Sequence, residues 1–84
     1  MQMKIVAMNS KVVMVQILYG IEKWNEIHLS HNKFERVMKD VFTDYYKDYE
    51  MSGQRESCAN FFYHYGETEM MQRKGIAFIY EAQD

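Results

Sequence analysis

Residues 30–53, SHNKFERVMKDVFTDYYKDYEMSG, carry the strongest structural signal in the chain. Ser30 can cap a helix, and Gly53 can adopt the left-handed conformation that ends many helices. Between them, large apolar side chains recur at spacings of three and four, the period of one helix face. The pattern predicts one long amphipathic helix over residues 31–51, whose apolar stripe is Phe34, Val37, Met38, Val41, Phe42, Tyr45 and Tyr49.

The segment before this helix reads as a β-hairpin. Residues 4–8 and 11–19 are rich in valine, isoleucine and methionine, and Asn9 and Ser10 between them can form a turn. The second of these strands is apolar on nearly both faces. We therefore expect it to lie centrally in a sheet.

Residues 12–24 also fit a helical period, so a helix is the alternative interpretation of this stretch. The β-branched residues within it and Gly20 favour the strand. A bent third strand over residues 21–29 then leads into the long helix.

Two further strands are predicted after the long helix. Residues 59–65 and 76–80 both alternate large apolar side chains, and Lys74 and Gly75 between them can turn. Residues 67–73 fit either another strand or a helical turn, and the sequence leaves this open.

The chain has 84 residues, of which 48% are hydrophobic, so it is long and apolar enough for one folded domain and is not intrinsically disordered. We expect a single α+β domain over residues 1–84, with a small antiparallel sheet of four to six strands and the long helix packed across one face. The predicted core is Val13, Val15, Ile17, Phe34, Val37, Met38, Val41, Phe42, Phe78 and at least one of Phe61 and Phe62.

The charge balance argues against a protein that binds nucleic-acid phosphates, because ten Lys and Arg face twelve Asp and Glu, a net charge of −2. Residues 1–42 carry the basic excess and residues 43–84 the acidic one. An acidic half can steer association with a basic partner.

The cellular location follows from one cysteine and one apolar stretch. Cys58 is alone, so the fold uses no internal disulfide and a reducing compartment is expected. Polar residues at positions 9–11 interrupt the apolar N-terminal segment, which is then too short for a secretory core or a membrane span. These features predict a soluble cytoplasmic protein with no membrane contact.

No motif for catalysis or metal binding is present. His28, His31, Cys58 and His64 are potential zinc ligands but lack the short paired spacings of zinc sites. A nucleophile pair of Cys58 and His64 would need a third group to orient it, and nothing in the sequence marks one. We therefore expect a protein that is not an enzyme and that uses no metal and no cofactor.

The aromatic run at residues 61–65, with Arg55, Arg73 and Lys74 nearby, could stack bases of single-stranded nucleic acid. Three basic residues in an acidic half do not make a phosphate groove, however. Nucleic acid is accordingly the less favoured partner.

The end of the long helix is the predicted partner-binding site. Three tyrosines there cannot all face one sheet at about 100° per residue, so at least one is expected to be exposed, and Tyr46 is the best candidate. Tyrosines framed by carboxylates suit a protein-docking surface. The candidate residues are Asp44, Tyr45, Tyr46, Asp48, Tyr49 and Glu50.

In size and composition the chain resembles small phage and mobile-element proteins that inhibit a host enzyme or defence complex, anti-CRISPR proteins among them. This resemblance implies a protein partner whose basic surface, such as one that binds nucleic acid, would be covered by the acidic half. The alternatives are a self-associating module, such as a homodimer, and a small single-stranded nucleic-acid-binding domain.

Overall fold

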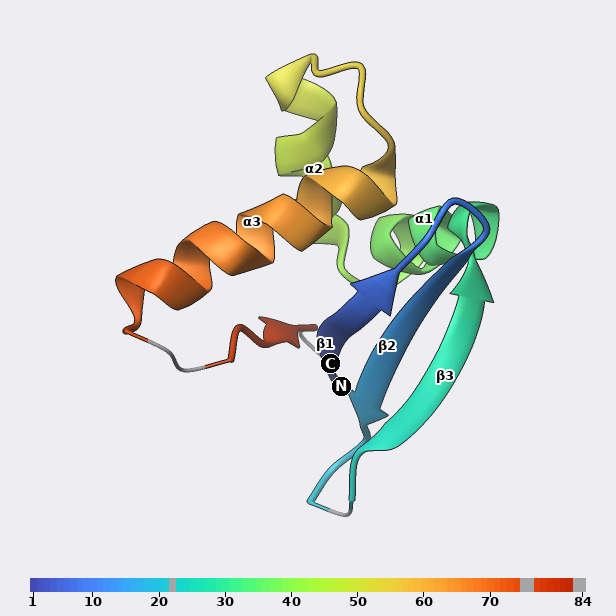
Figure 1. Ribbon diagram of the computed structural model, residues 1–84, viewed down its shortest axis with the longest axis vertical. Coiled ribbons are helices and arrows are strands. Elements are labelled where there is room, and N and C mark those ends of the chain that lie inside the picture. Colours follow the sequence, from blue (N-terminus) through green and yellow to red (C-terminus); the bar gives the residue numbers. More distant parts are fainter. Residues whose placement is uncertain (22, 75–76, 83–84) are drawn as a thin grey trace.

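The computed structural model describes residues 1–21, 23–74 and 77–82. These residues form an α+β fold in which a four-stranded antiparallel sheet, in the order β3-β2-β1-β4, is combined with three helices (Figure 1). The elements are β1 (Gln2–Met8), β2 (Val12–Leu18), β3 (Asn25–Ser30), α1 (His31–Asp40), α2 (Thr43–Ser52), α3 (Cys58–Gln72) and β4 (Tyr80–Glu81).

The predicted hairpin is confirmed. β1 and β2 are antiparallel partners, with Gln2 opposite Leu18 at one end and Met8 opposite Val13 at the other. The side chain of Asn9 shapes the turn between them. Its Oδ1 accepts hydrogen bonds from the backbone N–H groups of Lys11 and Val12 at 2.8 and 2.9 Å. The Asn9 side chain thus satisfies two backbone N–H groups of the turn, as in an Asx turn.

β2 is central, as predicted, because it pairs with β1 on one side and β3 on the other. The helical alternative for residues 12–24 is wrong, since residues 12–18 are strand. The third strand begins at Asn25 instead of residue 21. Val13, Val15 and Ile17 are buried beneath the helices, whereas the intervening side chains of β2 are only half-buried on the opposite face.

The predicted long helix is divided into α1 and α2. Both of its predicted ends are confirmed: the Ser30 hydroxyl accepts from the backbone N–H of Lys33 at 3.2 Å, and Gly53 has a φ of 66°. The helix breaks at Val41 and Phe42. Phe42 turns inward and is 1% exposed, while Val41 is 39% exposed, so its predicted place in the core is wrong.

The break determines how the helices are layered. α1 and α3 pack against the sheet, and α2 lies farther from it, against α1 and α3 (Figure 1). After the break, the aromatic face of α2 meets the aromatic face of α3.

The strand predicted over residues 59–65 is wrong, because this segment belongs to α3. The Ser57 hydroxyl caps the helix by accepting from the backbone N–H of Asn60 at 3.1 Å. A run of consecutive large side chains fits a strand and a buried helix equally well, and the cap decides in favour of the helix. Residues 67–73, left open by the sequence, continue α3 as far as Gln72.

The strand predicted over residues 76–80 is found only at its end. β4 pairs Tyr80 with Met3 and Glu81 with Gln2. Lys74, in the predicted turn, has a φ of 59°, whereas Gly75 and Ile76 lie outside the described residues. Among the described residues, no helix is long and apolar enough to cross a membrane.

The core lies between the sheet and the helices. Most of its predicted members are buried, but Val37 and Phe78 only pack against its margin. Tyr80, 1% exposed, donates its hydroxyl hydrogen to the carbonyl of Phe62 and so joins β4 to α3. The buried residues are Met3, Val13, Val15, Ile17, Phe34, Met38, Phe42, Tyr46, Cys58, Ala59, Phe62 and Tyr80.

Candidate protein-binding site

α2 carries all six residues of the predicted site, but the structure separates them into inward and outward groups. Phe42, Tyr46 and Tyr49 lie on one helix face because they are spaced four and three residues apart. After the break at Val41 and Phe42, this face is turned towards the core. That face packs inward. The remaining predicted residues lie on the flank or on the outward face.

Tyr46, predicted to be exposed, is buried with 9% of its surface accessible. Its hydroxyl donates a 2.9 Å hydrogen bond to Oε2 of Glu35 on α1. This bond to a carboxylate, together with burial, raises the pKa of Tyr46 from 10.0 to about 12. The prediction failed because it assumed one unbroken helix, in which Tyr45 instead of Tyr46 faces the core.

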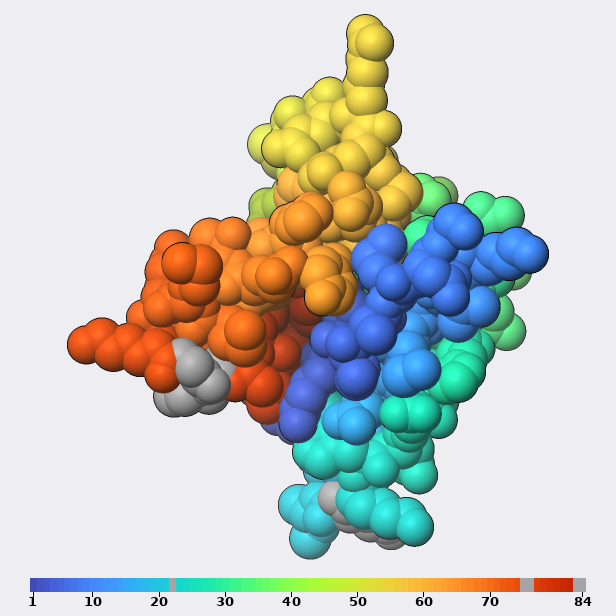
Figure 2. Space-filling view, in the orientation of Figure 1, coloured from blue at the N-terminus to red at the C-terminus, as the bar shows by residue number. Residues whose placement is uncertain are grey.

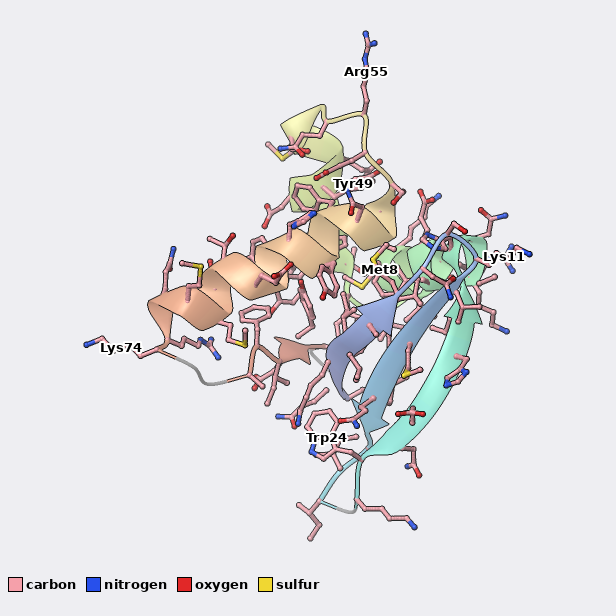
Figure 3. All side chains as sticks on the ribbon, viewed as in Figure 1. Met8, Lys11, Trp24, Tyr49, Arg55 and Lys74 are labelled. Carbon is pink, nitrogen blue, oxygen red and sulfur yellow. The ribbon has the colours of Figure 1, made fainter. Side chains whose placement is uncertain are left out.

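Tyr45 and Tyr49 are half-buried and link α2 to α3. The Tyr45 ring lies 5.0 Å from that of Tyr80 and 6.3 Å from that of Tyr65, both edge-on. Tyr49 lies 5.1 Å from the ring of Phe61 and donates its hydroxyl to the carbonyl of Glu56 at 2.8 Å (Figure 3). Both tyrosines therefore hold α2 in place, and only part of each ring is available to a partner.

The predicted carboxylates Asp44, Asp48 and Glu50 are exposed. Sequence reasoning missed Met51, which is 84% exposed and follows Asp48 by three residues and Asp44 by seven, on the same helix face. The spacing of Asp44, Asp48 and Met51 is visible in the sequence, but Met51 was not predicted to be part of the site because it lies at the end of the predicted helix. We define the α2 surface as Asp44, Tyr45, Lys47, Asp48 and Met51.

Acidic side chains of α3 extend this surface. Burial raises the pKa of Tyr65, the carboxylates of Glu69 and Asp48 raise it further, and Arg73 lowers it, so one carboxylate from each helix lies near this ring. Tyr45 and Tyr65 are in edge-on contact at the boundary between the helices. The α2 surface thus adjoins Tyr65 and Glu69 of α3.

A separate groove opens between β1 and α3, visible in Figure 2 as the hollow between the blue and orange atoms. Its volume is about 350 Å³. We define the β1 groove by six of its lining residues, which are Ile5, Val6, Phe62, Gly66, Met70 and Phe78. The sequence could not reveal it, because the strand assigned to residues 59–65 removed its α3 wall.

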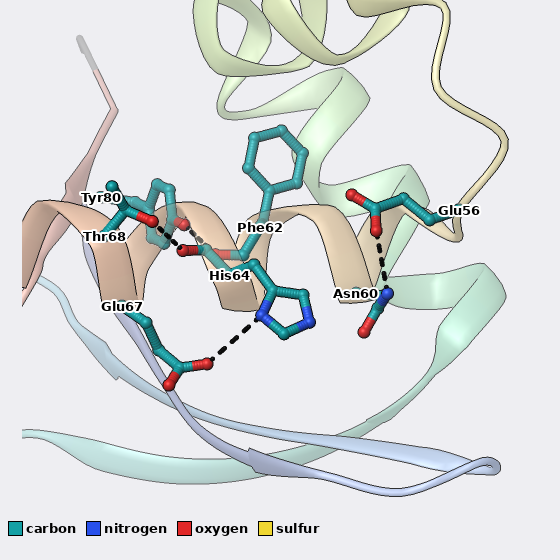
Figure 4. A network of polar contacts seen from close by, with 7 residues as sticks. All are labelled: Glu56, Asn60, Phe62, His64, Glu67, Thr68 and Tyr80. Carbon is teal, nitrogen blue, oxygen red and sulfur yellow. Dashed lines mark hydrogen bonds and ion pairs between the residues drawn. The ribbon is translucent and has the colours of Figure 1, made fainter.

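The potential metal ligands and nucleophiles are dispersed. His31 contacts the carbonyl of Asn9 at 2.7 Å, His28 lies by Glu26, and His64 lies 3.5 Å from Glu67 (Figure 4). Within the part of the chain that is described, no three His, Cys, Asp or Glu side chains gather as a metal site would require.

Cys58 is buried in the hydrophobic core, and burial raises its pKa to about 12. The thiol is therefore protonated at neutral pH. His64 follows six residues later on the same helix, about 9 Å along the axis, which is too far for it to take the thiol proton. These two residues do not form the pair considered from the sequence.

The aromatic run at residues 61–65 is helical, so it does not form the flat strand platform on which bases stack. Phe62 is fully buried and Phe61 packs against Tyr49. The structural basis of the single-stranded nucleic-acid hypothesis is therefore lost.

The chain was compared with protein-family models, curated proteins and solved structures, and none of them matched. Its surface chemistry alone therefore indicates what it could bind.

Proposed function

We propose that this protein is a non-enzymatic binding protein that docks on another protein through the α2 surface. The observation that carries the proposal is the exposed Met51 on the same helix face as Asp44 and Asp48. Methionine adapts its shape to a partner, and carboxylates around it orient the approach. Tyr45 adds a partly exposed aromatic edge to the same surface.

The charge of the surface supports a basic target. Asp44 and Asp48 outnumber Lys47 on α2, and Glu69 adds a further carboxylate from α3. Such a surface complements a region that is rich in Lys and Arg, including one that binds nucleic acid. Combined with the resemblance in size and composition to phage inhibitors of host enzymes and defence complexes, this favours inhibition by occlusion in the cytoplasm.

The test is affinity capture from a lysate of the host cells in which the chain is expressed, followed by quantitative mass spectrometry. The bait is compared with a variant that combines Asp44→Lys, Asp48→Lys and Met51→Ser. All three side chains are exposed, so the variant should fold. We expect the true partner to be depleted by more than about tenfold, since an apolar anchor and two rim charges are lost together.

A matched control variant carries Lys33→Glu and Arg36→Glu on the exposed face of α1. It should capture the same partner as the unaltered protein. A photoreactive residue in place of Met51 should crosslink to that partner, and one in place of Asn32 should not. The proposal fails if every captured protein binds the α2 variant and the unaltered protein equally.

A further inference from the structure

The edge of β1 is only partly covered. β4 pairs with Gln2 and Met3, and no described residue continues the pairing along Lys4–Met8 on that side. In an antiparallel ladder, alternate residues direct both backbone groups to the same neighbour. The carbonyl of Met1 accepts from Ala82, so Met3 and Ile5 also face the β4 side. The N–H and C=O of Ile5 thus face the β1 groove without a strand partner.

The groove beside this open edge is mainly apolar. Ile5 and Val6 line it from β1, Phe62 and Met70 from α3, and Phe78 from the segment that precedes β4. Val6 lies at an irregularity between Ile5 and Ala7, where it has no Cα partner in β2, and it is 44% exposed. The site therefore combines free backbone groups with apolar side-chain contacts.

The two walls of the β1 groove carry side chains of opposite charge. Lys4 of β1 also lines the groove, and its Nζ lies 4.2 Å from the centre of the Trp24 ring. Glu67 of α3 lines the other wall, where its Oε1 lies 3.5 Å from Nδ1 of His64 (Figure 4). An occupant with one acidic and one basic side chain around an apolar centre would match both walls.

We propose that the β1 groove binds an extended peptide segment of a partner protein, which adds to β1 as a short strand. The backbone groups of Ile5 specify an extended chain, because they bond to another backbone in the ladder direction. Alternate apolar side chains of the peptide would enter the groove. This second site lies on other elements than the α2 surface and does not depend on it.

A peptide is favoured over a second copy of the chain. α3 and the residues before β4 stand on the far side of the groove, which is about 350 Å³ in volume. This space suits one short extended segment, whereas the β1 edge of a second copy carries its own α3 beside it. The irregularity at Val6 also disrupts the regular edge that open-ended sheet growth would need.

The probe is a phage-displayed library of short random peptides, selected on the full chain. We expect an enriched pattern of alternating apolar residues with an acidic and a basic side chain. A synthetic peptide of that pattern is then N-methylated at alternate residues. Methylation of the set that bonds to β1 should abolish binding, and methylation of the other set should leave it unchanged, because only the N–H groups of the first set donate to the backbone of β1.

Val6→Lys tests the groove, and Ile21→Lys is its control, because Ile21 is an equally apolar residue that is fully exposed in the β2–β3 loop. We expect Val6→Lys to weaken peptide binding about tenfold or more, since a charge at a strand edge opposes strand addition. Equal binding by both variants, tolerance of both methylation patterns, or no enrichment over a blank selection would each overturn the proposal. Binding of the peptide to the α2 variant separates this result from the test of the proposed function.

Discussion

Tyr46 of α2 donates a hydrogen bond of 2.9 Å to Glu35 of α1, across the break that separates the two helices. The bond joins two helices that end and begin on either side of Val41 and Phe42. Contacts of Tyr49 with Phe61 secure the other side of α2. The orientation of the α2 surface therefore depends on residues that a partner would not touch.

Removing the Tyr46 hydroxyl tests this link. We expect Tyr46→Phe to lower the free energy of unfolding by about 1 to 2 kcal/mol, because it loses one hydrogen bond to a carboxylate and keeps the buried ring. Tyr46→Ala should cost about 3 kcal/mol or more, because the ring is lost as well. Urea unfolding measures both. Equal losses in the two variants would show that the hydroxyl contributes nothing.

Alkaline pH should destabilise the fold. The pKa of Tyr46 rises from 10.0 to about 12 on folding, and that of Cys58 from 9.0 to about 12, so the folded chain holds both protons more tightly than the unfolded chain. The free energy of unfolding should therefore be constant below about pH 9 and fall as the pH rises towards 12.

The two groups can be separated. Urea unfolding at a series of pH values should show the decline of Cys58→Ala beginning near pH 10 instead of near pH 9, because the thiol contribution is removed and that of Tyr46 remains. A free energy of unfolding that stays constant up to pH 12 would contradict the raised pKa values.

The helix break predicts opposite effects for two neighbouring substitutions. Val41 is 39% exposed, so Val41→Asp should change the free energy of unfolding by no more than about 1 kcal/mol. Met38 is fully buried, and Met38→Asp should cost several kcal/mol and abolish the cooperative thermal transition. Circular dichroism melting compares them. If Val41→Asp also unfolds the protein, α1 and α2 form one continuous helix.

Gly53 ends α2 with a φ of 66°, and no atom lies within 4 Å of where a Cβ would be placed. Gly53→Ala should therefore destabilise the fold by about 1 kcal/mol through backbone strain alone. Gly53→Asn should cost less, because asparagine tolerates this conformation better. Chemical unfolding of the two variants gives the comparison, and a stabilising alanine would contradict the left-handed end.

Local signals made part of the fold predictable. The Ser30 cap, the Asn9 turn and Gly53 each act within a few residues, and each lies where the sequence indicated. The break at Val41 and Phe42 has no such signal, since neither residue is a proline or glycine. After the break, aromatic side chains of α2 pack against α3, a contact between segments that only the folded chain brings together.

The candidate site was predictable to the same extent. Asp44 and Asp48 are exposed in either helix register, because charged side chains avoid the core. The prediction for Tyr46 was wrong because its burial depends on the break, which turns Tyr46 towards the core while Tyr45 stays half-buried. The β1 groove could not be predicted, because it is formed by segments that are distant in sequence. One of them, residues 59–65, was predicted to be a strand and is part of α3.

The pairing of β4 with β1 has a consequence for synthesis on the ribosome. Met3 is fully buried, yet its partner Tyr80 is synthesised after β1–β3 and α1–α3. Until Tyr80 has emerged, β1 lacks this partner, and closing so long a loop slows folding. The core is therefore completed only when β4 pairs with β1, and until then the chain is a substrate for chaperones that bind exposed apolar segments.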